Sequence, residues 1–319
     1  MKILVTGAAG FIGSILTPML LTEGHEVVAL DRFIYGNDTA LAACAAHPNF
    51  DVYRVDCRDL NAVRPHVKDA DCVIPLAGLV GVPLGNLNPI DAELLNLRAQ
   101  IGLFGLLSSE QLVVMPTTES SYGSNADVCD ETTPLNPLST YARHKVEVEN
   151  ALMARGNSIS LRLATVFGMS PRMRLDLLVN DFTYRALHDR ALVLFEGRYR
   201  RTCVHVRDVA RAFLHCLGHG VTAFDEFESG TPPAISLGIY NVGSCTMTKL
   251  SLCEAIQKRV PGFTFVEAPI AKDPDQRDYI VSDDKIRATG FQPLVDLDSG
   301  IKELLKGYRM LSNTVHGNI

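Results

Sequence analysis

The sequence lacks any apolar segment long enough to span a membrane. None of its hydrophobic runs approaches the ~20 residues that a bilayer-crossing helix needs. At the N-terminus, the short run from Ile3 to Val5 passes into a glycine-containing turn too soon to be the apolar region of a signal peptide. We therefore expect no membrane partner and a cytoplasmic location.

Cysteine pairs at metal-binding or redox spacing are missing as well. The eight cysteines are scattered and form no CxxC pair, which favours reduced thiols in a cytoplasmic protein. His215 and His219 stand four residues apart, a spacing that can hold zinc, but Gly218 and Gly220 interrupt the helix there. The sequence therefore predicts no metal site.

The chain also lacks an excess of positive charge. It has 36 Asp and Glu residues against 30 Lys and Arg, which gives a net charge of −6 and disfavours nucleic acid as a partner. Two local basic clusters stand out, at 172–174 and 198–201. They favour local capture of a small phosphorylated ligand over binding of an RNA backbone.

Through the first half of the chain, apolar strand-like runs alternate with helical patterns. Such alternation predicts βαβ units and a parallel sheet that is covered on both faces. We therefore predict an α/β fold whose first domain, residues 1–168, is a Rossmann-type doubly wound parallel sheet. The expected strands are 3–6, 26–30, 51–55, 72–76, 112–115 and 158–163, with helices at 11–22 and 91–108 among them.

After residue 168 this rhythm changes. The pattern predicts helices over 175–190, 208–217 and from about 248 onward, and a strand over 203–206. Residues 222–237 hold acidic residues, Gly and Pro without periodicity, so we expect a surface loop. We predict that residues 169–319 form mainly a smaller C-terminal lobe, with some segments returning to the main sheet.

A glycine-rich turn follows the first predicted strand. Gly7, Gly10 and Gly13 are spaced as GxxGxxG, with Phe11 and Ile12 between the last two. Glycines at such a turn let the backbone approach a pyrophosphate, and the N-terminus of the next helix favours its negative charge. Because the triplet both follows a strand and opens a helix, it predicts a dinucleotide site.

Acidic residues follow the next two predicted strands. Asp31 stands where it can accept hydrogen bonds from ribose hydroxyls, which favours NAD over its 2′-phosphorylated form. Arg32 comes directly after it and leaves that preference open. Asp56, followed by Cys57, either bonds the adenine amino group or serves only as a turn residue.

Tyr141 and Lys145 form a YxxxK pair on a predicted helix that Ser139 or Thr140 can cap. Residues four apart lie on one face of a helix. An ammonium beside a phenol favours the phenolate form, so the tyrosine can act as a general base at neutral pH. The pair alone is common, but after a complete dinucleotide loop it indicates a catalytic site.

Together, these motifs resemble the extended short-chain dehydrogenases/reductases, and among them the NAD-dependent epimerase/dehydratase family of nucleotide-sugar epimerase type. The resemblance runs through nearly the whole chain. It implies coenzyme contacts by Leu76-Ala77-Gly78 and Asn96, a catalytic hydroxyl at Thr118, and substrate contacts by Arg201, Asn180 and Arg277. It also implies NAD as cofactor and a substrate-binding role for the C-terminal lobe.

The family mechanism implies a role for each catalytic residue. Tyr141 removes a proton from a hydroxyl of a nucleoside-diphosphate sugar while a hydride passes to NAD, and Lys145 bonds the nicotinamide ribose. Thr118 bonds the reacting oxygen. The diphosphate pairs with Arg201, whose planar guanidinium suits phosphate oxygens. In an epimerase the resulting keto-sugar turns and is reduced on its other face.

Two departures bear on the reaction. Family 4,6-dehydratases carry a glutamate two residues after the threonine, whereas this chain has Glu119-Ser120, which argues against dehydration. Glu119 then serves either a second proton transfer or a hydrogen bond to backbone. The asparagine that often touches the sugar is replaced by Thr165, which suggests a sugar outside the best-known cases.

Other outcomes stay open at this point. A reductase or dehydrogenase that releases its coenzyme, or a dehydratase, would use the same motifs, and a non-catalytic RNA-binding or assembly protein would keep the same fold. The predicted helix 91–108 is apolar over more than one face. Its second face is buried either within one chain or against the Tyr141 helix of a partner, giving a homodimer with a four-helix contact as in relatives.

Overall fold

The protein is described here by a computed structural model that covers residues 1–36, 38–81, 87–125, 127–218, 235–268 and 278–311. Its largest feature is a seven-stranded sheet of order β3-β2-β1-β4-β5-β7-β11, in which every neighbouring pair is parallel. The strands are β1 (Lys2–Thr6), β2 (Glu26–Asp31), β3 (Phe50–Arg54), β4 (Cys72–Pro75), β5 (Leu112–Thr118), β7 (Ser158–Leu163) and β11 (Gly238–Val242). The predicted Rossmann-type sheet is confirmed.

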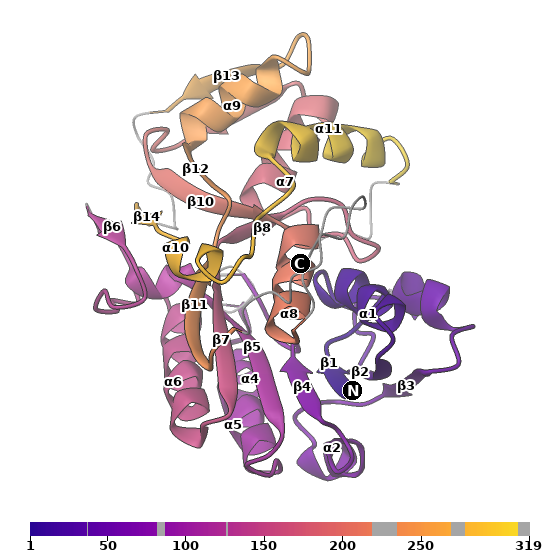
Figure 1. The fold of residues 1–319 in the computed structure, drawn as a ribbon. Coiled ribbons are helices and arrows are strands. Elements are labelled where there is room, and N and C mark those ends of the chain that lie inside the picture. Colours follow the sequence, from indigo (N-terminus) through magenta and orange to yellow (C-terminus); the bar gives the residue numbers. More distant parts are fainter. Residues whose placement is uncertain (37, 82–86, 126, 219–234, 269–277, 312–319) are drawn as a thin grey trace.

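Helices cover both faces of this sheet (Figure 1). One face packs on α1 (Gly13–Thr22) and α8 (Val206–Cys216), which also contact each other. The other face packs on α2 (Leu60–Val67), α5 (Ala99–Phe104) and α6 (Thr140–Arg155). The central strands are buried along almost their whole length, as expected for parallel strands between two helical layers.

Two segments of the second half of the chain belong to this main layer. Helix α8 lies beside α1, and β11 pairs with β7 in parallel from Gly238 to Val242. Residues 222–237 were expected to form a loop, of which 222–234 lie outside the described residues, and β11 was not predicted. Its run of five residues with a glycine at the start is too short to give a strong strand pattern in the sequence.

The predicted helix 91–108 is divided into three pieces. A first turn, α4 (Pro89–Glu93), leads into a π-helical stretch, η2 (Leu94–Arg98), and then into α5, which ends at Phe104. A π-turn inserts one extra residue into a helix and shifts the side chains that follow it. Here the stretch directs Asn96 and Gln100 toward the loop after β4.

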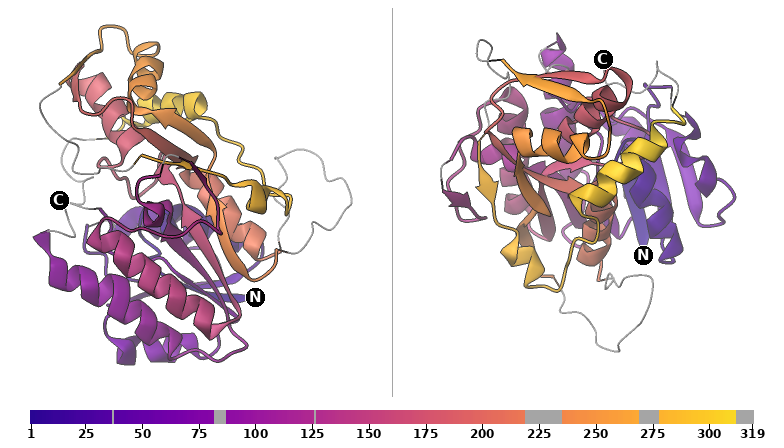
Figure 2. Two further views of the ribbon diagram at one scale, coloured as in Figure 1. Left: turned by 90° about the vertical axis from the view of Figure 1, so that its left-hand side faces the viewer. Right: turned by 90° about the horizontal axis from the view of Figure 1, so that it is seen from above.

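The second lobe lies above the carboxyl ends of the main strands (Figures 1 and 2). Its three-stranded sheet joins β8 (Thr165–Phe167), β10 (Arg200–His205) and β12 (Cys245–Thr248), with β10 in the centre. Helices α7 (Leu178–His188), α9 (Lys249–Gln257) and α11 (Leu297–Gly307) pack with it around a core that includes Phe167, Val179, Ile256 and Ile301.

The remaining elements are short. They are the 3₁₀ turns η1 (Asp38–Cys44) and η3 (Glu119–Tyr122), helix α10 (Asp284–Arg287), the pair β9 (Ala191–Leu194) and β13 (Thr264–Glu267), and the pair β6 (Val128–Cys129) and β14 (Ile280–Val281). Within the described residues, no helix has the length and apolar character to cross a membrane.

Candidate functional site

A cavity of about 720 Å³ lies between the main sheet and the second lobe. The glycine loop after β1, the loop after β4 and the end of β5 form its lower wall. Helix α6 and segments of the second lobe form the rest. Open α/β sheets bind ligands at the carboxyl ends of their strands, where the strand order reverses. Here the reversal falls between β1 and β4, directly under this cavity.

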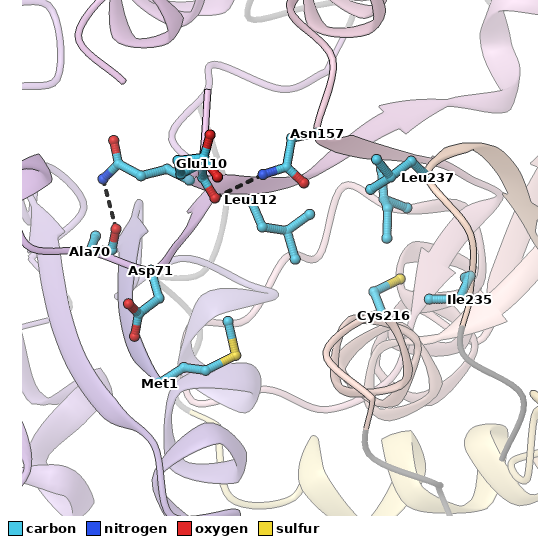
Figure 3. A pocket seen from close by; sticks show the side chains of 11 residues that line it. Met1, Ala70, Asp71, Glu110, Leu112, Asn157, Cys216, Ile235 and Leu237 are labelled. Carbon is cyan, nitrogen blue, oxygen red and sulfur yellow. Dashed lines mark hydrogen bonds between the residues drawn. The ribbon is translucent and has the colours of Figure 1, made fainter. Parts of the chain in front are cut away.

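A second hollow lies at the amino ends of the main strands, opposite the carboxyl ends that face the larger cavity (Figure 3). Met1, Asp71, Gln111 and Asn157, which directly precede β1, β4, β5 and β7, line it. Cys216 and Leu237 lie on its other side. None of the site residues expected from the sequence is among its lining residues. We therefore place the chemistry in the larger cavity.

The glycine loop has no room for a side chain at Gly7 or Gly13. Gly7 has a φ of +68°, and a Cβ on it would lie 2.6 Å from the backbone nitrogen of Ala77. A Cβ on Gly13 would lie 2.5 Å from the carbonyl oxygen of Ala8. Gly7, Gly10, Phe11, Ile12 and Gly13 all line the cavity. Bare backbone and the start of α1 thus face the space that a pyrophosphate needs, and the loop fits a dinucleotide.

Asp31 ends β2 and is held beside the glycine loop. Its Oδ2 accepts a hydrogen bond from the backbone of Ala9 at 3.0 Å, and its Oδ1 accepts one from Phe33 at 2.7 Å. The carboxylate is therefore fixed next to the turn where the adenosine ribose of a dinucleotide would lie.

Asp56 is engaged by two arginines. Arg58 donates to both of its carboxylate oxygens, at 3.1 Å and 2.8 Å, and Nη1 of Arg32 lies 3.3 Å from Oδ2. The hydrogen bonds from Arg58 hold the pKa of the Asp56 carboxyl below its usual value. Burial raises the pKa of the neighbouring Cys57 thiol to about 12, so this cysteine stays protonated at neutral pH. Arg32, Asp56 and Cys57 were the residues expected here. They follow the ends of β2 and β3 and are not among the residues that line the cavity.

Side chains of η2 and α5 form hydrogen bonds to the loop after β4. The Asn96 side chain accepts from the backbone nitrogen of Leu79 and donates to its carbonyl oxygen, both at 2.8 Å. Gln100 donates to the carbonyl of Ala77 at 2.7 Å. Leu76 and Gly78 line the cavity, whereas Asn96 does not. Asn96 therefore positions the loop that faces the ligand.

Helix α6 brings Tyr141 and Lys145 to the cavity, which both residues line. Ser139 caps the helix by accepting from Ala142 at 3.2 Å. Lys145 is buried, and its Nζ donates to the carbonyl of Pro116 at 2.9 Å. Burial lowers the pKa of the Lys145 ammonium to about 8, so the group can be charged at neutral pH and neutral slightly above it.

The end of β5 supplies a hydroxyl pair. Thr118 is the last residue of the strand, and its Oγ1 donates to Oγ of Ser120 at 2.9 Å while accepting from the Ser120 backbone at 3.1 Å. Both residues line the cavity. Ser120 was not singled out from the sequence. Its place two residues after Thr118 in a tight 3₁₀ turn is what brings it to the same surface.

Glu119 lies between these two residues but points elsewhere. It is 1% exposed and is not among the lining residues of the cavity. Its Oε1 would lie 3.7 Å from a Cβ on Gly243, which places the carboxylate near β10 and the start of β12. The structure thus does not bring Glu119 to the surface shared by Thr118 and Tyr141.

The second lobe gives the cavity a basic wall. Arg201 is 2% exposed, stands on β10 and lines the cavity. Arg174, Arg185 and Lys249 also line the cavity, where Arg174 pairs with Asp176 and Arg185 pairs with Asp181. Arg185 and Lys249 were not expected from the sequence, because no motif marks them. Four cations against two carboxylates leave this wall with a net positive charge, which suits a diphosphate.

Asn180 connects two segments of the second lobe through hydrogen bonds of its side chain. It is fully buried on α7, where its Oδ1 accepts from Gly168 at 3.0 Å and its Nδ2 donates to the carbonyl of Arg174 at 2.8 Å. It is not among the residues that line the cavity, so it orders the segment that carries Arg172 and Arg174. The other expected substrate residue, Arg277, lies outside the described residues.

Comparisons with known proteins agree with this geometry. One relative, the UDP-glucuronic acid decarboxylase 1 of Danio rerio, is 25% identical over 320 residues, covering 96% of this chain and 72% of its own. The UDP-glucose 4-epimerase of Thermotoga maritima, solved with UDP-glucose, superposes with a TM-score of 0.81 and 25% identity, covering 97% of this chain and 99% of its own. The UDP-glucose 4-epimerase of Thermus thermophilus, solved in complex with NAD, gives 0.80 and 26%, with coverage of 97% and 99%.

The family itself follows from a match over most of the chain. Residues 3–243 match the family described as the NAD dependent epimerase/dehydratase family. The match spans every strand of the main sheet, the YxxxK pair and the basic strand β10. The expected family and the expected cofactor, NAD, are both confirmed. This chain is thus an enzyme that belongs to the NAD dependent epimerase/dehydratase family, with NAD as its coenzyme.

Proposed function

We propose that this enzyme is a nucleotide-sugar epimerase that works through a transient keto-sugar. The observation that carries the proposal is the set of groups that share one cavity. The glycine loop, the residues Thr118, Tyr141 and Lys145, and the basic wall around Arg201 all line it. A sugar that is joined to a nucleoside diphosphate matches this set, with its reacting hydroxyl beside Tyr141.

In this arrangement Tyr141 accepts the proton of a sugar hydroxyl and later returns it. Lys145, whose Nζ is fixed by the carbonyl of Pro116, keeps a positive charge beside the tyrosine and favours its phenolate form. In the structure the Thr118 hydroxyl donates to Ser120; when substrate binds, it turns to donate to the reacting oxygen and orients it. Bound NAD supplies reversible hydride transfer at the sugar carbon that carries this oxygen.

The basic wall accounts for the nucleotide half of the substrate. Arg201 and Lys249 present cations from β10 and the start of α9, and phosphate oxygens accept well from both side chains. The names of similar proteins support the same class of substrate, because the relatives above act on or bind UDP-sugars. Binding at the diphosphate leaves the sugar free to turn between its oxidation and its reduction.

The positions of the acidic residues favour epimerisation over dehydration. A dehydratase needs a base at the sugar carbon next to the ketone. Ser120, a hydroxyl, lines the cavity where that base is expected, and Glu119 is directed toward Gly243. Our proposal therefore assigns no proton transfer to Glu119.

The test begins with the purified protein as isolated. Mass spectrometry after gentle denaturation reports whether NAD is retained, and incubation with a panel of nucleotide sugars is followed by NMR. Retained NAD with a product of equal mass supports the epimerase. Accumulating NADH identifies a dehydrogenase, loss of water identifies a dehydratase, and loss of carbon dioxide identifies a decarboxylase. Any of these three outcomes overturns the proposal.

We further propose that the enzyme is a homodimer. Along the helical run from α4 to α5, Ile90 is 74% exposed, Leu94 is 42% exposed and Ile101 is 40% exposed. These residues form an apolar face beside α6, and a second copy of the same face would bury it in a four-helix contact. Light scattering of the wild type should give twice the chain mass, and Ile101→Glu should give the single mass. A monomeric wild type would rule the contact out.

A further inference from the structure

A segment of the second lobe is bonded directly to the glycine loop. Oγ of Ser170 donates to the carbonyl oxygen of Phe11 at 2.7 Å and lies 2.9 Å from Oγ of Ser14. Ser170 and Ser14 are 7% and 2% exposed. These contacts hold the segment 168–174 across the first turn of α1, on the side where the loop faces the cavity.

Two residues farther along, Arg172 stacks on a tyrosine of the opposite wall. Its guanidinium carbon lies 4.0 Å from the centroid of the Tyr35 ring, and its Nη1 donates to the carbonyl of Met173 at 2.5 Å. Arg172 is 2% exposed, whereas Tyr35 is half-buried. Tyr35 belongs to the turn that follows Asp31 at the end of β2.

This pair stands over the coenzyme half of the cavity. Tyr35 and Arg172 line it together with Gly7, Gly10 and Gly13. The glycines mark the place of the pyrophosphate and Asp31 marks the place of the adenosine ribose. The pair therefore joins the turn after β2 to the second lobe at the position where the adenosine and pyrophosphate groups would lie.

We infer that Tyr35 and Arg172 form a clasp that retains NAD on the enzyme. For the coenzyme to leave past this wall, the ring must separate from the guanidinium. A partly desolvated contact between a guanidinium and an aromatic ring should slow that separation by about 3- to 30-fold. The inference rests on the coenzyme, which the family assigns, and it holds whichever net reaction the enzyme catalyses.

The test measures release of NADH from the preloaded, full-length enzyme. The chain has no tryptophan, so the fluorescence of NADH can be followed without overlap while excess NAD replaces it. Tyr35→Leu removes the ring, and Tyr35→Phe is the matched control that keeps it. We expect release to be about 3- to 30-fold faster in Tyr35→Leu and changed by less than about twofold in Tyr35→Phe.

Arg172→Met tests the other half of the clasp. It should accelerate release as much as Tyr35→Leu does, and the double variant should be no faster than either single variant, because each change removes the same contact. A release rate of Tyr35→Leu equal to that of the wild type overturns the inference. An Arg172→Met enzyme that releases NADH at the wild-type rate also overturns it. If that enzyme melts at a lower temperature without NAD, the contact stabilises the fold but does not retain the coenzyme.

Discussion

Tyr141 carries the most direct test at the scale of single residues. Replacing it with phenylalanine removes the proton acceptor but keeps the ring that lines the cavity. We expect NAD binding to be nearly unchanged and turnover to fall by ~10²–10⁴-fold, as for the loss of an acid–base group. The measurement is the rate of sugar conversion by NMR, with Tyr53→Phe on the exposed edge strand as control. Undiminished turnover of Tyr141→Phe would exclude the proposed mechanism.

Lys145 makes a prediction about stability and pH. Burial lowers the pKa of its ammonium to about 8 in the folded chain, whereas an unfolded lysine keeps its proton to a higher pH. Between these two values the unfolded state holds more protons, so this residue makes folding more favourable as the pH rises above about 8. Below that pH, the buried charge destabilises the folded state by a constant amount.

The comparison with Lys145→Met isolates this contribution from the other alkaline titrations. Urea unfolding of both proteins at pH 7, 8, 9 and 10 gives the difference in their unfolding free energies. We expect the difference to be flat between pH 7 and about 8 and then to shift in favour of the wild type. A difference that is independent of pH would mean that Lys145 is not desolvated as the structure indicates.

At the scale of elements, α6 is anchored to the sheet by a buried ion pair below its catalytic turns. Arg162 on β7 lies 2.6 Å from Glu149 of α6, which also accepts from Thr117 and Ser160. Both charged side chains are buried, at 4% and 3% exposure. Glu149 stands one turn after Lys145, so this contact fixes the height and rotation of the helix that presents Tyr141.

Breaking this pair from one side should therefore be costly. Glu149→Gln leaves Arg162 as a buried charge without its carboxylate, and we expect a loss of about 3–5 kcal/mol in unfolding free energy, measured by urea denaturation. Arg162→Met combined with Glu149→Gln should lose less than the sum of the two single changes, because the uncompensated charge is gone. Strictly additive losses would show that the two side chains do not interact.

Most elements of the main sheet could be predicted from the sequence, because parallel strands between helices appear as continuous apolar runs. The glycine loop and the YxxxK pair could be found for a similar reason, since each is a local pattern. Asn96 and Asn180 were expected to touch ligands. In the structure their amides bond backbone at Leu79, Gly168 and Arg174, a choice of partner that depends on tertiary packing.

Other parts of the site left no local signal. Ser120 reaches the cavity through the tight turn after β5, and Lys249 through the start of α9. Tyr35 and Arg172 meet across two segments that are far apart in the chain. Contacts of this kind arise from the arrangement of elements and cannot be read from spacing along one segment.

At the scale of the whole molecule, the cavity takes one wall from each lobe, and each wall should bind its own part of the ligands. NAD should raise the melting temperature of the coenzyme-free protein through the glycine loop, and UDP should raise it through the basic wall. At a ligand concentration of 100 times Kd, each effect corresponds to about 2.7 kcal/mol. Thermal melting with each ligand alone and with both together measures this.

Neighbouring arginines on β10 provide the control for this experiment. Arg201→Met should abolish the shift caused by UDP and keep the shift caused by NAD, because Arg201 lines the cavity. Arg200→Met should keep both shifts, since Arg200 instead pairs with Asp278 at 2.9 Å. If UDP produces no shift in the wild type, the basic wall is not a nucleotide site.

The place of β11 in the sheet bears on how the chain is made. β7 is complete at Leu163, but the strand that covers its outer edge begins only at Gly238. Synthesis proceeds at about 5–20 residues per second, and the helices and strands of the second lobe are made between β7 and β11. The backbone groups at the outer edge of β7 therefore stay unpaired for several seconds. Exposed strand edges are templates for wrong pairing between chains. The nascent protein is thus most vulnerable to aggregation before its C-terminal half leaves the ribosome, and a fragment ending near residue 168 should need a chaperone to remain dispersed.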